Sequence, residues 1–253
     1  MTVHFSCTMC GKCCHGLRLP LSLSEAGEWL RRGGDVQLFC EAIPWPVEPE
    51  ESNLQARHKR RRSFAALSGD LPIRVVVSVV ASFDGPCPNL LPDMRCGAYE
   101  ARPLACRIYP AEVNPFIELV PASKSCPSEA WAADQPTFLQ GGRLVNSATV
   151  IAAERFRLND YHDAGTRARL CDELGIGVAS LANEGFVIHS IQRDVMTDAL
   201  ARIDRDTGAG VEPANWQFVT NNTSTREILL EIGAHVYAHE TASSSRTMQY
   251  LAF

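Results

Sequence analysis

Apolar residues in the first third of the chain predict one amphipathic helix and one buried strand. Ser22 and Glu25 have the spacing of a helical capping box, the apolar residues that follow lie near one face, and the pair Gly33-Gly34 would end the helix. The run IRVVVSVVASF at residues 73–83 is β-branched and too apolar for a surface loop, so it predicts a buried strand.

The pattern is weaker between and after these elements. Residues 40–72 are rich in proline and predict irregular structure, with the basic run at 57–62 on an exposed loop. Residues 84–110 combine prolines, glycines and cysteines and predict mostly turns. Residues 116–120 are a short strand candidate.

Beyond residue 140 the spacing of apolar residues becomes helical. It follows the three- and four-residue rule at 147–159, 163–174 and 187–205. Ser224 and Glu227 form a second capping-box pattern that opens a last predicted helix. The residues that this helix would turn inward are Ile228, Leu229, Ile232 and Val236.

These elements predict an α+β protein with two domains. Cysteines stop and helices start near residues 133–142. We therefore expect an irregular, cysteine-rich metal-binding domain with few short strands over residues 1–135, and a mostly helical domain of unassigned role over residues 136–253.

Charge and composition exclude several classes of protein. The chain has 253 residues, with 24 Lys and Arg against 29 Asp and Glu, so its net charge of −5 gives no global attraction to nucleic acid or to an anionic membrane. It contains no run of about 18 apolar residues that could span a membrane. The N-terminal residues lack the pattern of a signal peptide, so we expect a cytoplasmic protein.

Ten cysteines are the unusual feature of the composition, and nine of them lie within residues 1–126. In a reducing compartment, a cluster of this kind favours a metal site over structural disulfides. A catalytic dithiol at Cys7 and Cys10 would leave the other clustered cysteines unexplained, and no thioredoxin-like pattern surrounds it. Cys40 and Cys171 stand outside the cluster, and Cys171 has the setting of a small buried apolar residue.

The first cysteines have the spacing of metal ligands. Cys7, Cys10 and Cys13 form C-x-x-C-x-x-C, the opening of a bacterial iron–sulfur run, and Gly11 stands where the backbone must bend toward the sulfurs. Cys14 departs from that run. Neighbouring side chains of an extended chain point in opposite directions, so we expect Cys13 and Cys14 to serve different sites or different atoms of a cluster.

Four later cysteines supply further ligands. Cys87 and Cys126 are each followed by proline, as in ferredoxin runs, and Cys96 and Cys106 flank an Arg-Pro pair. The eight thiols fit two centres, with three early cysteines joined by one later cysteine and Cys14 joined by the other three. They fit equally well a single four-cysteine cluster with four supporting thiols.

These motifs together resemble a known family. FSCTMCGKCC at residues 5–14, GPCPNLLPDMRCGAYEARPLACRIYP at 85–110 and Cys126-Pro127 resemble the CxxCxxCC (YkgJ-like) cysteine-cluster family, which is described as zinc- or iron-chelating. The resemblance covers about residues 5–127 and implies a metal centre, either zinc or an iron–sulfur cluster. The ligands would be Cys7, Cys10, Cys13, Cys14, Cys87, Cys96, Cys106 and Cys126.

One branch of the family resembles flagellin lysine N-methylases, which carry an iron–sulfur cluster in a similar cysteine domain. This implies, as an alternative, an enzyme that uses S-adenosylmethionine, although the chain is short for that branch and shows no glycine-rich Rossmann loop. A zinc-stapled interaction module is a second alternative. We prefer an iron–sulfur centre, of the [4Fe–4S] type, over zinc, and we expect a metal ion or cluster, with a protein partner besides, rather than a membrane or nucleic acid.

Several other side chains are candidates for supporting roles. Arg102, Arg107 and Tyr99 would offset the charge of clustered thiolates and donate hydrogen bonds near them. His4 and His15 flank the first cysteines and rank below the thiols as ligands. His235 and His239, preceded by Glu231, would share a face of the last predicted helix, where a solvated face is a better interpretation than a metal site.

Overall fold

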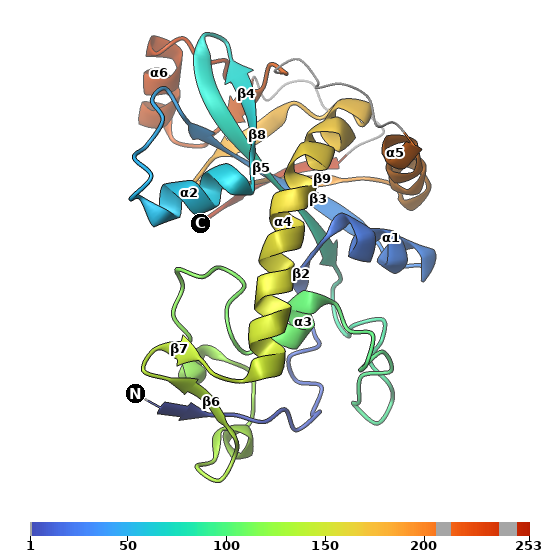
Figure 1. Cartoon of the computed structure of the whole chain (residues 1–253). Helices are drawn as coiled ribbons and strands as arrows, with labels where there is room; N and C mark the ends of the chain where they lie inside the picture. Colours follow the sequence, from blue (N-terminus) through green and yellow to red (C-terminus); the bar gives the residue numbers. More distant parts are fainter. Residues whose placement is uncertain (1, 206–213, 238–246) are drawn as a thin grey trace. The chain divides into compact units, whose positions relative to one another are not determined.

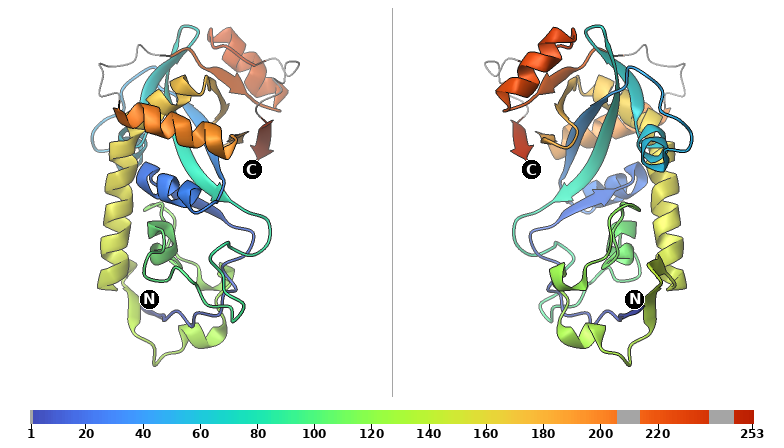
Figure 2. Two further views of the ribbon diagram at one scale, coloured as in Figure 1. Left: turned by 90° about the vertical axis from the view of Figure 1, so that its right-hand side faces the viewer. Right: turned by 90° about the vertical axis from the view of Figure 1, so that its left-hand side faces the viewer.

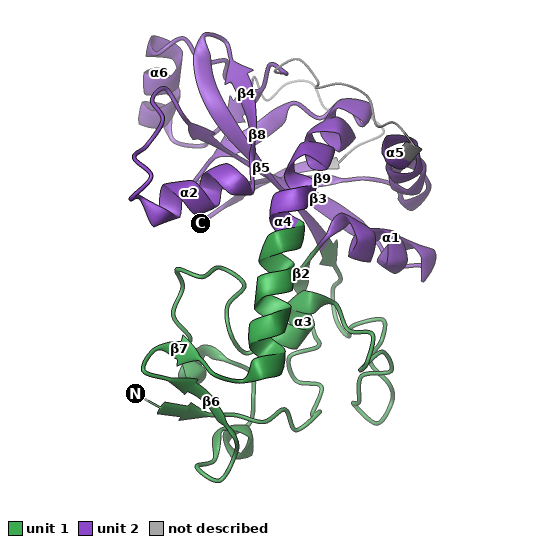
Figure 3. Cartoon of the chain, viewed as in Figure 1, with its two compact units in different colours: residues 1–21, 81–159 green, residues 22–80, 160–253 purple. Residues whose placement is uncertain are grey.

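The computed structural model describes residues 2–205, 214–237 and 247–253. It divides into two compact units, and each unit is built from two separate stretches of chain (Figure 3). Unit 1 consists of residues 1–21 and 81–159, and unit 2 of residues 22–80 and 160–253. The expected division at residue 135 would give two domains that are each one continuous stretch of chain, whereas each of these units combines two separate stretches.

Unit 1 contains a small antiparallel sheet and long irregular connections. Its three strands are β1 (Thr2–His4), β6 (Thr137–Gln140) and β7 (Arg143–Leu144), with β6 in the middle. The other regular elements are β2 (Arg18–Leu21), α3 (Leu104–Ile108), the 3₁₀ turns η1 (Pro121–Ser123) and η2 (Ser128–Trp131), and residues 147–159 of helix α4 (Ser147–Glu173).

An aromatic group forms the centre of the unit 1 core. The ring of Phe5 lies 4.7 Å from Trp131 and 5.3 Å from Phe138 between ring centroids. Leu104 and Ile108 of α3 belong to the same buried cluster. The core therefore joins the start of the chain to segments more than 90 residues later, which fixes the irregular loops between them.

Unit 2 contains a larger mixed sheet. Along it the strands run β10 (Gln217–Val219), β8 (Val178–Leu181), β3 (Val36–Pro44) and β5 (Leu71–Ser82). β8 is parallel to both β10 and β3, whereas β9 (Gly185–Ser190) is antiparallel to β3 and to β11 (Thr247–Ala252). β4 (Phe64–Ser68) is antiparallel to β5.

The helices of unit 2 are α1 (Leu23–Arg31), α2 (Leu54–Arg61), residues 160–173 of α4, α5 (Arg193–Arg205) and α6 (Thr223–Glu231) (Figure 1). α1 and α5 contact each other (Figure 2). The Arg193 guanidinium at the start of α5 donates to the Gly34 carbonyl at 3.0 Å. Mixed helices and sheets confirm the predicted α+β class. Among the described residues, none of the helices has the length and apolar character needed to cross a membrane.

The strongest local signals of the sequence are confirmed. The Ser22 side chain accepts a hydrogen bond from the Glu25 backbone, and the Glu25 carboxylate accepts one from the Ser22 backbone, which completes the capping box of α1. Gly33, with φ of +87°, follows the end of that helix. The strand expected at residues 73–83 is β5, and the two helices expected at 147–159 and 163–174 are one helix, α4.

Three predictions in the middle of the chain are wrong. Residues 40–72 are not irregular, because they include most of β3, all of α2 and β4. Residues 116–120 form no strand. The helix expected at 187–205 is strand β9 followed by α5, since a short apolar run such as Val187-Ile188 is equally compatible with a buried strand, and here it pairs with β3.

The last predicted helix is also misplaced. The side chain of Asn222, not Ser224, caps α6 by accepting from the Thr225 backbone at 3.2 Å. Leu229 is buried, but Ile228 lies on the exposed face of the helix, and Ile232, which follows its last residue Glu231, is exposed too. His235 therefore lies beyond α6 and not on it, and His239 lies outside the described residues, so the expected helical face of two histidines does not form.

The basic run at residues 57–62 lies on α2 and its C-cap rather than on a loop. Its charges are engaged within unit 2: Arg60 pairs with Glu48 at 3.1 Å, and the Arg61 guanidinium lies 4.3 Å from the centre of the Tyr161 ring. Arg62 pairs with Asp160 at 3.0 Å. These contacts fix the run as part of the fold.

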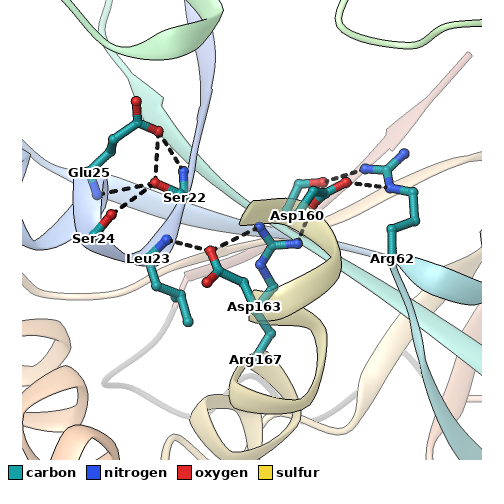
Figure 4. Close-up of polar contacts among 9 residues, drawn as sticks. Ser22, Leu23, Ser24, Glu25, Arg62, Asp160, Asp163 and Arg167 are labelled. Atoms are coloured by element: carbon teal, nitrogen blue, oxygen red, sulfur yellow. Dashed lines mark hydrogen bonds and ion pairs between the residues drawn. The ribbon is translucent and has the colours of Figure 1, made fainter. Parts of the chain in front are cut away.

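A buried ion network anchors α4 within unit 2 (Figure 4). Asp160 forms an ion pair with Arg62 and accepts a hydrogen bond at 2.5 Å from Arg167, whose side chain is 3% exposed. Arg167 also lies 3.7 Å from Asp163, which accepts a 2.8 Å hydrogen bond from the Leu23 backbone at the start of α1. Burial raises the pKa of Asp163 despite these partners. The network joins α1, α2 and α4 through groups that are costly to bury unpaired.

Removing the charge of Asp160 should therefore destabilise unit 2. Asp160→Asn leaves the buried Arg167 without its principal counter-ion, and we expect a loss of about 3 kcal/mol in the free energy of unfolding, measured by urea denaturation. Arg31→Ala is the matched control, because it removes an exposed ion pair with Glu28 and should change the stability far less. Equal losses in the two variants would contradict this account of the network.

Candidate metal centre

The loop that carries the first four cysteines is fixed at its two ends to different segments of unit 1. At its start, the backbone N–H groups of Phe5 and Ser6 donate to the carbonyls of Pro136 and Ala130, each at 3.0 Å. At its end, Gly16 donates to the Gly85 carbonyl at 2.7 Å. The segment 130–136 follows Cys126 closely, so the loop begins beside Cys126 and ends beside the segment that leads into Cys87.

A tight turn in the middle of the loop explains its glycine. Cys14 donates its backbone N–H to the Gly11 carbonyl at 2.9 Å, and Gly11 has a φ of +68°, which side chains disfavour. A Cβ at this position would lie 2.6 Å from the Met94 carbonyl oxygen. The glycine therefore permits both the turn between Cys10 and Cys13 and the close approach of the 94 loop.

Cys126 belongs with the cysteines at the start of the loop. Burial raises the pKa of Cys126, a hydrogen bond from the Tyr109 hydroxyl lowers it, and the charges of Cys7 and Cys10 raise it again. The same hydroxyl accepts from the Ser125 backbone at 3.1 Å. We call this set the Cys126 group. Its members are Cys7, Cys10, Cys13 and Cys126.

Cys14 belongs with the other three later cysteines. The backbone N–H of Cys87 donates to the Cys14 carbonyl at 2.8 Å, and an antiparallel bridge pairs Leu90 with Cys96. Burial, with the charges of Cys87 and Cys14, raises the pKa of Cys106 to about 12. We call this set the Cys106 group. Its members are Cys14, Cys87, Cys96 and Cys106.

The two groups meet at the adjacent residues Cys13 and Cys14. Their thiols share a hydrogen bond, which raises the pKa of Cys13 and lowers that of Cys14 to about 6, with His15 and Arg102 nearby lowering it further. The opposite orientation expected for an extended chain is therefore not what the structure has. The segment is a turn, and a turn can direct two neighbouring side chains the same way.

The predicted supporting residues differ in position. The charge of Arg102 lowers the pKa of both Cys14 and Cys106, and its guanidinium lies 3.7 Å from the centre of the Tyr99 ring. Arg102 also donates to the Tyr99 carbonyl at 2.9 Å. Arg107 lies on the exposed side of α3, away from this arrangement. The geometry thus brings Arg102 and Tyr99 to the Cys106 group and leaves Arg107 at the surface.

Two supporting residues were missed at the sequence level. Tyr109 contacts the Cys126 thiol, and the charge of Lys124 lowers the pKa of Cys126 while its ammonium group lies 5.6 Å from the centre of the Tyr109 ring. Lys124 also pairs with Glu112. Its place two residues before Cys126 is the only sequence signal that could have indicated the lysine.

The remaining cysteines and histidines lie apart from the two groups or at their edge. Cys40 and Cys171 are buried in unit 2, where burial and a hydrogen bond that the Cys40 thiol donates to Cys171 raise the pKa of Cys40. His4 lies 2.8 Å from the Gln135 carbonyl through its Nδ1. His15 lies beside Cys14, with its Nδ1 3.2 Å from the Gly11 carbonyl.

The chemistry of the donor set fits a thiophilic metal. All ten cysteines lie in the described ranges and all are free thiols. Soft thiolates select zinc and iron–sulfur clusters over hard cations. Within those ranges, no three His, Cys, Asp or Glu side chains converge on one point at ligand distances. The backbone therefore brings the eight thiols into two neighbourhoods, and metal binding would draw the side chains together.

The turn at Gly11 can be tested against a matched glycine. Gly11→Ala should reduce both the metal content and the thermal midpoint for two reasons. The new Cβ would clash with the Met94 carbonyl, and the positive φ at this position is strained for alanine. Gly16→Ala is the control, since Gly16 also has a positive φ, +57°, but open space around it. It should lose about 1 kcal/mol from the backbone alone and keep its metal. If the two variants lost metal equally, the close approach would not matter.

One comparison with known proteins finds a match, and it covers part of the chain. No curated protein and no solved structure matches the chain. Residues 6–127 match the model of the CxxCxxCC family, described as "Putative zinc- or iron-chelating domain", and this range contains all eight cysteines of the two groups.

Proposed function

We propose that this protein binds metal through the eight clustered cysteine thiolates of unit 1, in the form of iron–sulfur of the [4Fe–4S] type, which takes four thiolates per cluster. The observation that carries the proposal is the gathering of eight free thiols, from both ends of the matched range, in one compact unit. The ligands are Cys7, Cys10, Cys13, Cys14, Cys87, Cys96, Cys106 and Cys126.

Iron–sulfur is preferred over zinc because of the form of the motif. C-x-x-C-x-x-C is the opening of bacterial cluster-binding runs, and Cys87 and Cys126 are each followed by a proline, as ligands in such runs often are. Zinc is the competing metal, since C-x-x-C followed by glycine is also a common zinc turn. The lysine methylase and zinc-stapled module remain alternatives drawn from the resemblance alone.

The residues around the thiols would adjust the charge of the bound group. A bound iron–sulfur cluster supplies one-electron redox chemistry or structural support. Arg102 beside the Cys106 group and Lys124 beside the Cys126 group place positive charge near the thiolates. The Tyr109 hydroxyl donates a hydrogen bond to the Cys126 sulfur. Hydrogen bonds and charges of this kind tune affinity and potential in metal sites generally.

Elemental analysis of anaerobically purified protein tests the metal. We expect a coloured protein that contains iron and acid-labile sulfide, because cluster ligation by thiolates absorbs in the visible range. A colourless protein with stoichiometric zinc would overturn the iron–sulfur proposal and keep metal binding. A protein that carries neither metal, and takes up neither when its reduced form is reconstituted, would overturn both.

A further inference from the structure

We propose that the eight cysteines form two separate four-thiolate centres, one on Cys7, Cys10, Cys13 and Cys126 and the other on Cys14, Cys87, Cys96 and Cys106. This inference rests on the proposed function and deepens it. The alternative, which the sequence leaves equally open, is one four-cysteine centre supported by four thiols that do not bind metal.

The loop at residues 5–16 runs between two different segments of unit 1. Its start is hydrogen-bonded to residues 130–136, which follow Cys126, and its end to residues 85–87. The order of the early cysteines along the loop is therefore also an order in space, from the Cys126 segment to the Cys87 segment. Cys7 thus lies toward the Cys126 segment, and Cys14 lies toward the Cys87 segment.

Three of the later cysteines are held close to one another. Cys87 and Cys96 are joined by a compact turn, in which Leu90 donates to the Cys87 carbonyl at 2.8 Å and Gly97 donates to the Asn89 carbonyl at 2.7 Å. The Cys106 thiol on α3 lies within electrostatic reach of both of these thiols. Three later cysteines thus form one neighbourhood, and the hydrogen bond from Cys87 to the Cys14 carbonyl adds the fourth.

Positive charge lies beside both groups. The Lys124 ammonium lies 5.6 Å from the centre of the Tyr109 ring, whose hydroxyl contacts Cys126. The Arg102 guanidinium lies 3.7 Å from the centre of the Tyr99 ring, in the turn that leads into Cys106. A set of four thiolates carries net negative charge even when it holds a divalent ion or a cluster, so each centre needs compensation. Two cations at two places fit two centres better than one centre with spare thiols.

Four thiolates are also the full complement of one structural zinc ion or one [4Fe–4S] cluster. Two groups of four therefore leave no clustered thiol without a metal. The groups touch where the Cys13 and Cys14 thiols share a hydrogen bond. Adjacent cysteines that serve different clusters are consistent with ferredoxin-type runs, in which one cysteine of a run ligates the other cluster.

Variants in the full chain separate the two arrangements. Cys10→Ser removes one ligand of the Cys126 group, Cys96→Ser removes one of the Cys106 group, and Cys171→Ser removes a buried thiol of unit 2 as a control. Metal per chain should fall to about half of the wild-type value in each of the first two, to near zero in the double variant, and not at all in the control. One single variant that lost all metal beside another that kept all of it would overturn the inference.

A titration of the unsubstituted protein tests the number of centres even if the variants fail to fold. The reduced, metal-free chain is titrated with Co²⁺, which thiolates bind in place of zinc or iron, and the thiols that still react with a thiol reagent are counted. We expect protection of four thiols per ion until two ions per chain are bound. Saturation at one ion, with four clustered thiols still reactive, would overturn the two centres and leave the proposed function intact. Failure to bind any Co²⁺ would overturn both.

Discussion

Two sets of backbone hydrogen bonds hold the loop at residues 5–16, and the arrangement of the cysteines depends on them. One set joins Phe5 and Ser6 to the segment after Cys126, and the other joins Gly16 and Cys14 to the segment that leads into Cys87. The loop has little regular structure of its own, so these contacts, with the packing of Phe5 against Trp131 and Phe138, are what determine its path. The sorting of eight thiols into two neighbourhoods follows from that path.

The two units handle buried charge in different ways. Unit 2 pairs it internally, as at Asp160 and Arg167, where each group is the counter-ion that the other needs. Unit 1 instead gathers thiols that repel one another once they ionise, with Lys124 and Arg102 as the cations that act on them. Because burial raises the pKa of Cys87, Cys106 and Cys126, these thiols favour their neutral form in the chain alone, and each must lose its proton to bind a metal.

The sequence predicted best where the signal is local. The capping box at Ser22, the glycine after α1 and the β-branched run of β5 depend on neighbouring residues. The ligand role of Cys7, Cys10 and Cys13, inferred from their spacing, stays a prediction. The sequence failed where the deciding contact is distant. Val187-Ile188 is a strand because β3 and β11 lie on either side of it, and the basic run is a fixed helix because Asp160 and Tyr161, a hundred residues later, receive its charges. The roles of Tyr109 and Lys124 were hidden for the same reason, since neither has a distinctive spacing of its own.

The interleaving of the two units has a consequence for the order in which the protein is made. Unit 1 has all of its residues once position 159 has been synthesised, whereas unit 2 still lacks strands β8 to β11 at that point. The polypeptide grows from its N-terminus at a few residues per second, roughly 5–20, so several seconds separate the synthesis of residue 159 from that of β11. The eight thiols are thus present together, and available to a metal donor, while half of the mixed sheet has yet to be synthesised. A nascent chain halted at that stage already contains all eight clustered cysteines.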